Sequence, residues 1–177
     1  MLNTAVPVLG LAAYSGTGKT ALLTKLIPLL KTAGLRVAAI KHAHHDVDVD
    51  QPGKDSYEIR KAGADQVLLA TSRRWALMVE AETVREPDLQ TLLDRLDRSR
   101  IDLVLVEGFR HLSFPKIELH RPTLGKPLLF PHDPSIIALA TDADLSAATG
   151  LPLLDINRPE KIRDFVLQWL DGRKDLP

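Results

Sequence analysis

The sequence contains no cysteine and has no excess of either charge, since 23 Lys and Arg residues balance 23 Asp and Glu residues. Without thiols, the chain cannot form disulfides, thiolate nucleophiles or cysteine-based metal sites. A net charge of zero gives no global field that would attract nucleic acid or an anionic membrane, so we expect neither as a partner. No apolar run approaches the roughly 20 residues that a membrane-spanning helix needs.

Internal repeats and low-complexity linkers are also missing, and 177 residues fit a single domain. The apolar stretch from Met1 to Ala13 has no Lys or Arg in front of it and runs directly into a glycine-rich loop. It therefore favours a buried first strand over a signal peptide, and we expect a cytoplasmic protein.

Strand and helix patterns alternate along the chain. A buried strand is predicted at Val6–Ala13, a helix at Gly18–Ala33 and a second buried strand at Leu35–Ile40. A strand–helix–strand unit of this kind is typical of a parallel sheet covered by helices. The other predicted strands are 101–106, 136–140 and 153–156, with an antiparallel hairpin at 66–71 and 75–80 and an antiparallel strand with one solvated face at 116–121. The other predicted helices are 56–62, 88–98 and a C-terminal helix opened by the capping-box segment 157–160.

The most specific motif is Ala13-Tyr14-Ser15-Gly16-Thr17-Gly18-Lys19-Thr20. It matches the P-loop consensus G-x-x-x-x-G-K-[ST], with alanine in place of the first glycine. In such a loop the backbone N–H groups and the helix N-terminus bind phosphates, Lys19 adds its charge at the β- and γ-phosphates, and Thr20 offers a hydroxyl to Mg²⁺. The sequence therefore predicts an α/β P-loop NTPase fold over residues 1–177, with a mainly parallel sheet flanked by helices and an antiparallel hairpin extension.

A P-loop site also needs an acid near Mg²⁺, at the carboxyl end of a buried strand. Glu107 follows the apolar run Leu103–Val106 and fits this position. We expect it to serve the metal or to orient the attacking water, and to act with Lys19 in catalysis. Asp102 precedes the same strand, so in a parallel sheet it lies at the opposite edge.

The segment 41–50 is rich in His and Asp and leaves the second predicted strand. It is compatible with three interpretations. It could be a nucleotide-sensing loop, with Lys41 or His42 near the phosphates and Asp48 or Asp50 near Mg²⁺. It could be a separate transition-metal site built on His42, His44 and His45. It could also be an ordinary solvated loop.

Further motifs accompany the P-loop along the chain. The segments are Tyr14–Thr20, Ile40–Asp46, Gly53–Tyr57, Arg60–Ala64, Arg74–Met78, Val106–Phe109 and Leu154–Asn157. Together they resemble the molybdopterin-guanine dinucleotide biosynthesis protein B (MobB) family. The resemblance covers nearly the whole chain, and the His-rich segment together with Gly-Lys-Asp-Ser makes it far more specific than the P-loop alone.

The resemblance implies a protein that binds GTP with Mg²⁺ and hydrolyses it weakly. It implies an adapter that works beside the MobA-like molybdenum cofactor guanylyltransferase and molybdopterin-handling proteins, and a homodimer formed through an extended sheet. By the same resemblance, residues 16–20 are phosphate ligands, and Thr20 and Glu107 serve Mg²⁺.

Guanine recognition is a separate hypothesis, because the usual Asn-Lys-x-Asp motif is absent. Asp142 follows the predicted strand 136–140, where its carboxylate would accept hydrogen bonds from guanine. The alternative function is a small-molecule kinase or an ATP-dependent ligase, because the P-loop fits that chemistry equally well. The sequence shows no obvious arginine finger or water-orienting glutamine, which is consistent with slow hydrolysis.

Overall fold

The computed structural model describes residues 2–43, 47–83, 86–145 and 149–174. They fall into two compact units: residues 1–42 with 88–177, and residues 43–87. Each unit is described here by itself. The single-domain prediction for 1–177 therefore stays a prediction.

The larger unit is built on a six-stranded sheet in which all neighbouring strands run parallel. The carboxyl ends of all six strands therefore meet at one edge, where ligands bind in folds of this type. This architecture confirms the predicted fold class. In spatial order the strands are β2 (Val37–Lys41), β5 (Leu103–Glu107), β1 (Val8–Ala12), β6 (Lys116–His120), β7 (Ile136–Thr141) and β8 (Leu153–Asp155).

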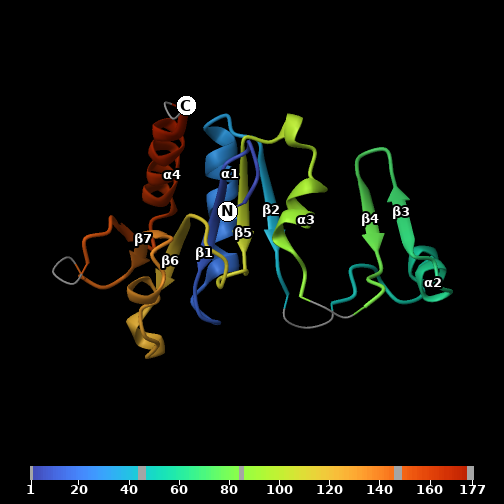
Figure 1. Ribbon diagram of the computed structural model, residues 1–177, viewed down its shortest axis with the longest axis horizontal. Coiled ribbons are helices and arrows are strands. Elements are labelled where there is room, and N and C mark those ends of the chain that lie inside the picture. The colour runs from blue at the N-terminus through green and yellow to red at the C-terminus, as the bar shows by residue number, and fades with distance from the viewer. Residues whose placement is uncertain (1, 44–46, 84–85, 146–148, 175–177) are drawn as a thin grey trace. The chain divides into compact units, whose positions relative to one another are not determined.

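Helices cover both faces of this sheet (Figure 1). On one face, α1 (Lys19–Thr32) and α4 (Pro159–Lys174) share a core with β1 residues Leu9 and Leu11. On the other face, α3 (Leu89–Asp94) packs against Val8, also from β1. Neighbouring residues of a strand point to opposite faces, so a strand covered on both sides must be apolar throughout. All five residues of β1 are buried, as the predicted strand requires.

The orientation predicted for 116–121 was wrong, because β6 pairs in parallel with both β1 and β7. Its polar residues Lys116 and Glu118 are buried rather than solvated. The Lys116 ammonium lies 3.0 Å from an Asp133 carboxylate oxygen. The Glu118 carboxylate accepts hydrogen bonds from the backbone N–H groups of Leu129 (2.7 Å) and Phe130 (2.8 Å). An alternating pattern does not distinguish a solvated face from one whose polar groups are paired inside the protein.

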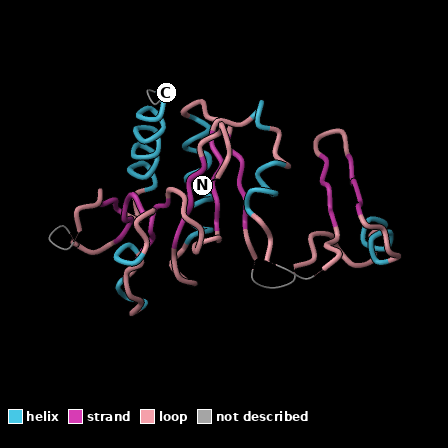
Figure 2. The backbone as a smooth tube through the Cα atoms, in the orientation of Figure 1, coloured by secondary structure: helices cyan, strands magenta, loops and turns pink. Residues whose placement is uncertain are grey.

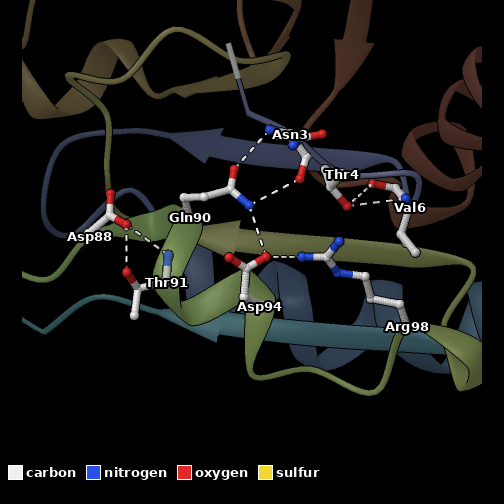
Figure 3. A network of polar contacts seen from close by, with 8 residues as sticks. All are labelled: Asn3, Thr4, Val6, Asp88, Gln90, Thr91, Asp94 and Arg98. Atoms are coloured by element: carbon white, nitrogen blue, oxygen red, sulfur yellow. Dashed lines mark hydrogen bonds and ion pairs between the residues drawn. The ribbon is translucent and has the colours of Figure 1, made fainter.

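The predicted helix 88–98 begins as expected but is shorter. The Asp88 side chain caps α3 by accepting a hydrogen bond from the Thr91 N–H at 2.8 Å. The helix ends at Asp94 and is followed by a 3₁₀ turn, Arg98–Arg100. Figure 3 shows Gln90 of α3 exchanging two hydrogen bonds with the backbone of Asn3, which fixes this short helix to the N-terminal segment.

The connection between β6 and β7 is long (Figure 2). It contains two 3₁₀ turns, Pro122–Leu124 and Phe130–His132. None of the helices in the described ranges is long and apolar enough to cross a membrane.

The smaller unit contains α2 (Asp55–Lys61) and an antiparallel hairpin, β3 (Gln66–Ala70) and β4 (Trp75–Val79), as predicted. Its polar centre is Arg60. The Arg60 side chain is almost buried, and its guanidinium bonds the carboxylates of Asp48, Asp50 and Glu80 at 2.8, 2.7 and 3.1 Å. This group connects the segment before α2 to the helix and to the end of the hairpin.

Gly10 offers a direct test of how tightly β1 packs against its neighbours. A Cβ atom at this position would lie 2.7 Å from Lys116 Cγ and 2.8 Å from a Phe114 ring carbon. We expect Gly10→Ala to lower the free energy of unfolding by about 1–3 kcal/mol because of this overpacking. Urea denaturation followed by circular dichroism measures the change.

The matched control is Gly172→Ala in α4, where an added Cβ meets nothing within 4 Å. This variant should be unchanged or more stable by up to about 1 kcal/mol, since alanine favours a helix. Equal stability of both variants would contradict the described packing.

Candidate functional site

The segment between β1 and α1 folds into a compact loop around the Lys19 side chain. The Lys19 ammonium donates hydrogen bonds to the backbone carbonyls of Ala13 (3.2 Å) and Tyr14 (3.0 Å). Gly16 and Gly18 have φ angles of 83° and 100°, in the left-handed region that glycine enters without strain. This is the backbone that the P-loop motif predicts.

The Lys19 ammonium lies in a partly desolvated and mixed electrostatic environment. Burial lowers its pKa from the ordinary value, the Glu107 carboxylate acts in the opposite direction, and the charges of Arg110 and Lys41 lower the pKa further. Three cations and one carboxylate therefore act on one another at this edge of the sheet. Such a surplus of positive charge suits a polyanionic ligand.

Glu107 and Lys41 lie side by side because β2 and β5 are neighbours. They are register partners in the parallel pairing, and the Lys41 ammonium lies 3.8 Å from a Glu107 carboxylate oxygen. The Glu107 side chain is only 12% exposed. The backbone N–H of His42 donates to the Glu107 carbonyl at 2.8 Å, which extends the contact between these strands by one residue.

On the other side of β1 from β5 and β2, Arg121 connects the ends of three strands. Its guanidinium donates to the Thr17 carbonyl (3.3 Å), to the Asp142 carboxylate (2.5 Å) and to the Asn157 side-chain oxygen (2.9 Å). Arg121 follows β6, Asp142 follows β7 and Asn157 follows β8. This arrangement connects the P-loop backbone to the last two strands of the sheet.

A pocket of about 370 Å³ opens beside this arginine. It is lined by Gly16, Thr17 and Gly18 from the P-loop and by Arg121, Asn157 and Pro159. A larger hollow of about 500 Å³ lies between β8 and α4, but no P-loop residue lines it. We therefore place the candidate site at the smaller pocket, where the phosphate-binding backbone contributes to the wall.

Most predicted site residues belong to the larger unit and to its carboxyl-end edge. Asp48 instead belongs to the smaller unit, where it bonds Arg60, so its role in binding Mg²⁺ stays a prediction. His44 and His45 lie outside the described residues. Within the described ranges, no group of three or more His, Asp or Glu side chains is arranged to hold a metal ion. The predicted residues brought to the edge are Ser15, Gly16, Thr17, Gly18, Lys19, Thr20, Lys41, His42, Glu107 and Asp142.

Three residues at this edge were missed by sequence reasoning. Arg121 contacts Asp142 and Asn157 only through tertiary structure, although Asn157 belongs to a segment of the family resemblance. Arg110 lies beside the P-loop, with its guanidinium carbon 5.6 Å from the centroid of the Tyr14 ring. The signal that points to Arg110 is its position three residues after the strand-end acid Glu107.

The parallel sheet, the loop around Lys19 and the helix that follows define a P-loop NTPase fold, which is a nucleotide-binding fold. The profile of the family described as "Molybdopterin guanine dinucleotide synthesis protein B" (MobB) matches residues 8–142. The chain belongs to this family.

Relatives with established names agree with this membership. The "Molybdopterin-guanine dinucleotide biosynthesis adapter protein" of Escherichia coli (strain K12) is 52% identical over 169 residues, which are 95% of this chain and 95% of that protein. The protein of the same name from Haemophilus influenzae is 47% identical over 170 residues, 96% of this chain and 92% of its own length.

Solved structures show the same fold. One titled "Crystal Structure of molybdopterin-guanine biosynthesis protein B (mobB)" superposes with a TM-score of 0.71 at 27% identity, covering 92% of this chain and 99% of that one. A MobB homolog from Bacillus stearothermophilus superposes with a TM-score of 0.68 at 21% identity, over 93% and 98% of the two chains, and supports the fold alone.

Proposed function

We propose that this protein is a GTP-binding adapter in the biosynthesis of molybdopterin guanine dinucleotide, with weak Mg²⁺-dependent GTPase activity. The observation that carries the proposal is the loop around Lys19, with left-handed glycines at 16 and 18 and an ammonium held at its centre. The adapter role is supported by relatives with this name, because the chain aligns with them along nearly their whole length. The same proposal places the protein in the cytoplasm, where GTP is available.

The residues at the loop fit a triphosphate and a divalent cation. Backbone N–H groups of 15–18 and the N-terminus of α1 would bind the phosphates, and Lys19 would lie beside the β- and γ-phosphates. Thr20 lies in the first turn of α1, and its hydroxyl with the largely buried Glu107 carboxylate would serve Mg²⁺. When bound, the ion neutralises charge on the phosphate oxygens.

The pocket beside Arg121 suits the nucleoside. Asp142 lies next to this pocket, because one oxygen of its carboxylate bonds the wall residue Arg121 at 2.5 Å, and its other oxygen is an acceptor. A carboxylate in that position would accept hydrogen bonds from guanine N1 and N2, which adenine cannot donate. Asn157, which also bonds Arg121, adds a polar side chain to the pocket wall.

The residues near Glu107 are consistent with slow hydrolysis. The described segments after β2 and β5, residues 42–43 and 108–114, contain no glutamine or asparagine that would orient a water molecule. In other P-loop proteins a glutamine at such a position orients the attacking water. An adapter that acts through its bound state does not need rapid turnover.

The proposed partners are a second copy of this chain and, in the pathway, a MobA-like guanylyltransferase with molybdopterin-handling proteins. The hairpin supports the dimer. The cross-strand pair Val67 and Met78 is buried, whereas Leu68, Leu77 and Trp75, which project from the opposite face, are 62%, 43% and 69% exposed. An exposed apolar sheet face of this kind supports a protein interface, and packing against a second copy of the chain would cover it.

Replacement of Lys19 by alanine tests the phosphate site. We expect Lys19→Ala to weaken Mg²⁺-dependent GTP binding at least about tenfold, because a charge-assisted contact to the phosphates is lost. Isothermal titration calorimetry measures the affinity. Lys31→Ala, near the exposed C-terminal end of α1, is the control and should bind like the parent protein. Undiminished binding by Lys19→Ala would refute the proposed site.

Asp142→Asn tests base recognition. An amide nitrogen replaces one acceptor oxygen, so the preference for GTP over ATP should fall by about tenfold or more. Competition of the two nucleotides against a fluorescent GTP analogue measures this preference. Asp164→Asn, at an exposed position of α4, serves as the control. An unchanged preference in Asp142→Asn would remove this carboxylate from the base site.

A double variant of the hairpin, Leu68→Lys with Leu77→Lys, tests the dimer. Two charges on the apolar face should convert the dimer to a monomer in sedimentation equilibrium, since burying them without partners is costly. Val49→Lys, another exposed apolar position in the same unit, should leave the dimer intact. A dimer that persists in the double variant would show that this face is not the interface.

A further inference from the structure

The order of the strands gives a bound nucleotide a direction. The pocket beside Arg121 and Asn157 lies toward β6, β7 and β8, whereas Glu107 and Lys41 end β5 and β2 on the other side of β1. If the nucleoside occupies the pocket, as proposed above, the P-loop backbone holds the middle of the phosphate chain. The terminal phosphate then lies toward the carboxyl end of β5.

An unusual turn follows β5 at this place. Gly108 has a φ of 103°, and Phe109 has a φ of 50°, the one positive φ of a non-glycine residue in the described ranges. A side chain in this region is strained and persists where its surroundings fix it. The Phe109 ring is buried and stacks on the His42 ring, with 4.7 Å between centroids. A Cβ atom at Gly108 would lie 2.6 Å from His42 Cβ, so the turn has room only for glycine.

Because of this turn, Arg110 lies beside the P-loop. The Arg110 guanidinium lies over the Tyr14 ring, within the first residues of the loop, and its charge reaches the Lys19 ammonium. Arg110 forms no ion pair with any carboxylate of the described residues. The Arg110 guanidinium thus lies over an aromatic ring of the P-loop, acts electrostatically on the Lys19 ammonium and has no carboxylate partner among the described residues, which suits an anion that both cations share.

We propose that Arg110 contacts the terminal phosphate of the bound nucleoside triphosphate and makes the protein bind the triphosphate in preference to the diphosphate. The proposal rests on the proposed function, since it assumes a nucleotide in the P-loop. Beyond that function, it assigns to Arg110 the preference for a nucleoside triphosphate over a diphosphate.

The test compares two affinities in each protein variant. A non-hydrolysable GTP analogue and GDP, both with Mg²⁺, are titrated into the parent protein, Arg110→Ala and Arg110→Lys. Arg110→Ala should lower the ratio of triphosphate to diphosphate affinity by about tenfold, with GDP affinity nearly unchanged, because one charge-assisted contact is lost. Arg110→Lys keeps the charge and should retain part of the preference.

Arg173→Ala is the matched control, because it removes another exposed guanidinium that lies on an aromatic ring, 5.1 Å from the Trp169 centroid on α4. Its affinity ratio should equal that of the parent. A parental ratio in Arg110→Ala, or an equal loss of affinity for both nucleotides, would overturn the role of Arg110 while leaving the proposed function intact. Failure of the parent protein to bind either nucleotide would overturn both.

Discussion

The position of β1 between β5 and β6, with all three strands parallel, is the constraint on which the rest of the site depends. It brings the P-loop into line with the acid that ends β5 and with the arginine that follows β6. An antiparallel β6 would carry Arg121 to the opposite edge and separate it from the Thr17 carbonyl. The buried pairings of Lys116 and Glu118 therefore have a functional consequence, because they allow β6 to be covered on both faces.

Electrostatics at this edge follow from the same strand order. Lys19, Lys41 and Arg110 act together with a single carboxylate, Glu107. Like charges held together without enough counter-charge raise the free energy of the unliganded protein and favour an anionic ligand. Arg121 differs from Lys19 and Arg110 because it forms an ion pair, with Asp142, and it connects the P-loop to the residues that follow β7 and β8.

The sequence predicted the features that depend on residues close together in the chain. The P-loop is one contiguous motif, and Glu107 was found because a strand-end acid has a fixed place in a parallel sheet. Arg121, Asp142 and Asn157 meet across 21 and 36 residues of sequence, so no local pattern indicates their contact. The position of Arg110 depends on the left-handed backbone of Phe109, which propensities do not favour. The direction of β6 depends on the burial of Lys116 and Glu118, each with its own partners inside the protein. An alternating pattern does not reveal such partners.

A crystal structure with a non-hydrolysable GTP analogue and Mg²⁺ would test whether this edge is a nucleotide site with the direction described. The guanine should lie in the pocket beside Arg121 and Asn157, and the terminal phosphate should lie beside Lys19, toward β5. The Mg²⁺ ion should contact the Thr20 hydroxyl. An analogue bound away from the loop 13–20, or one with its base toward β5 and β2, would contradict this arrangement.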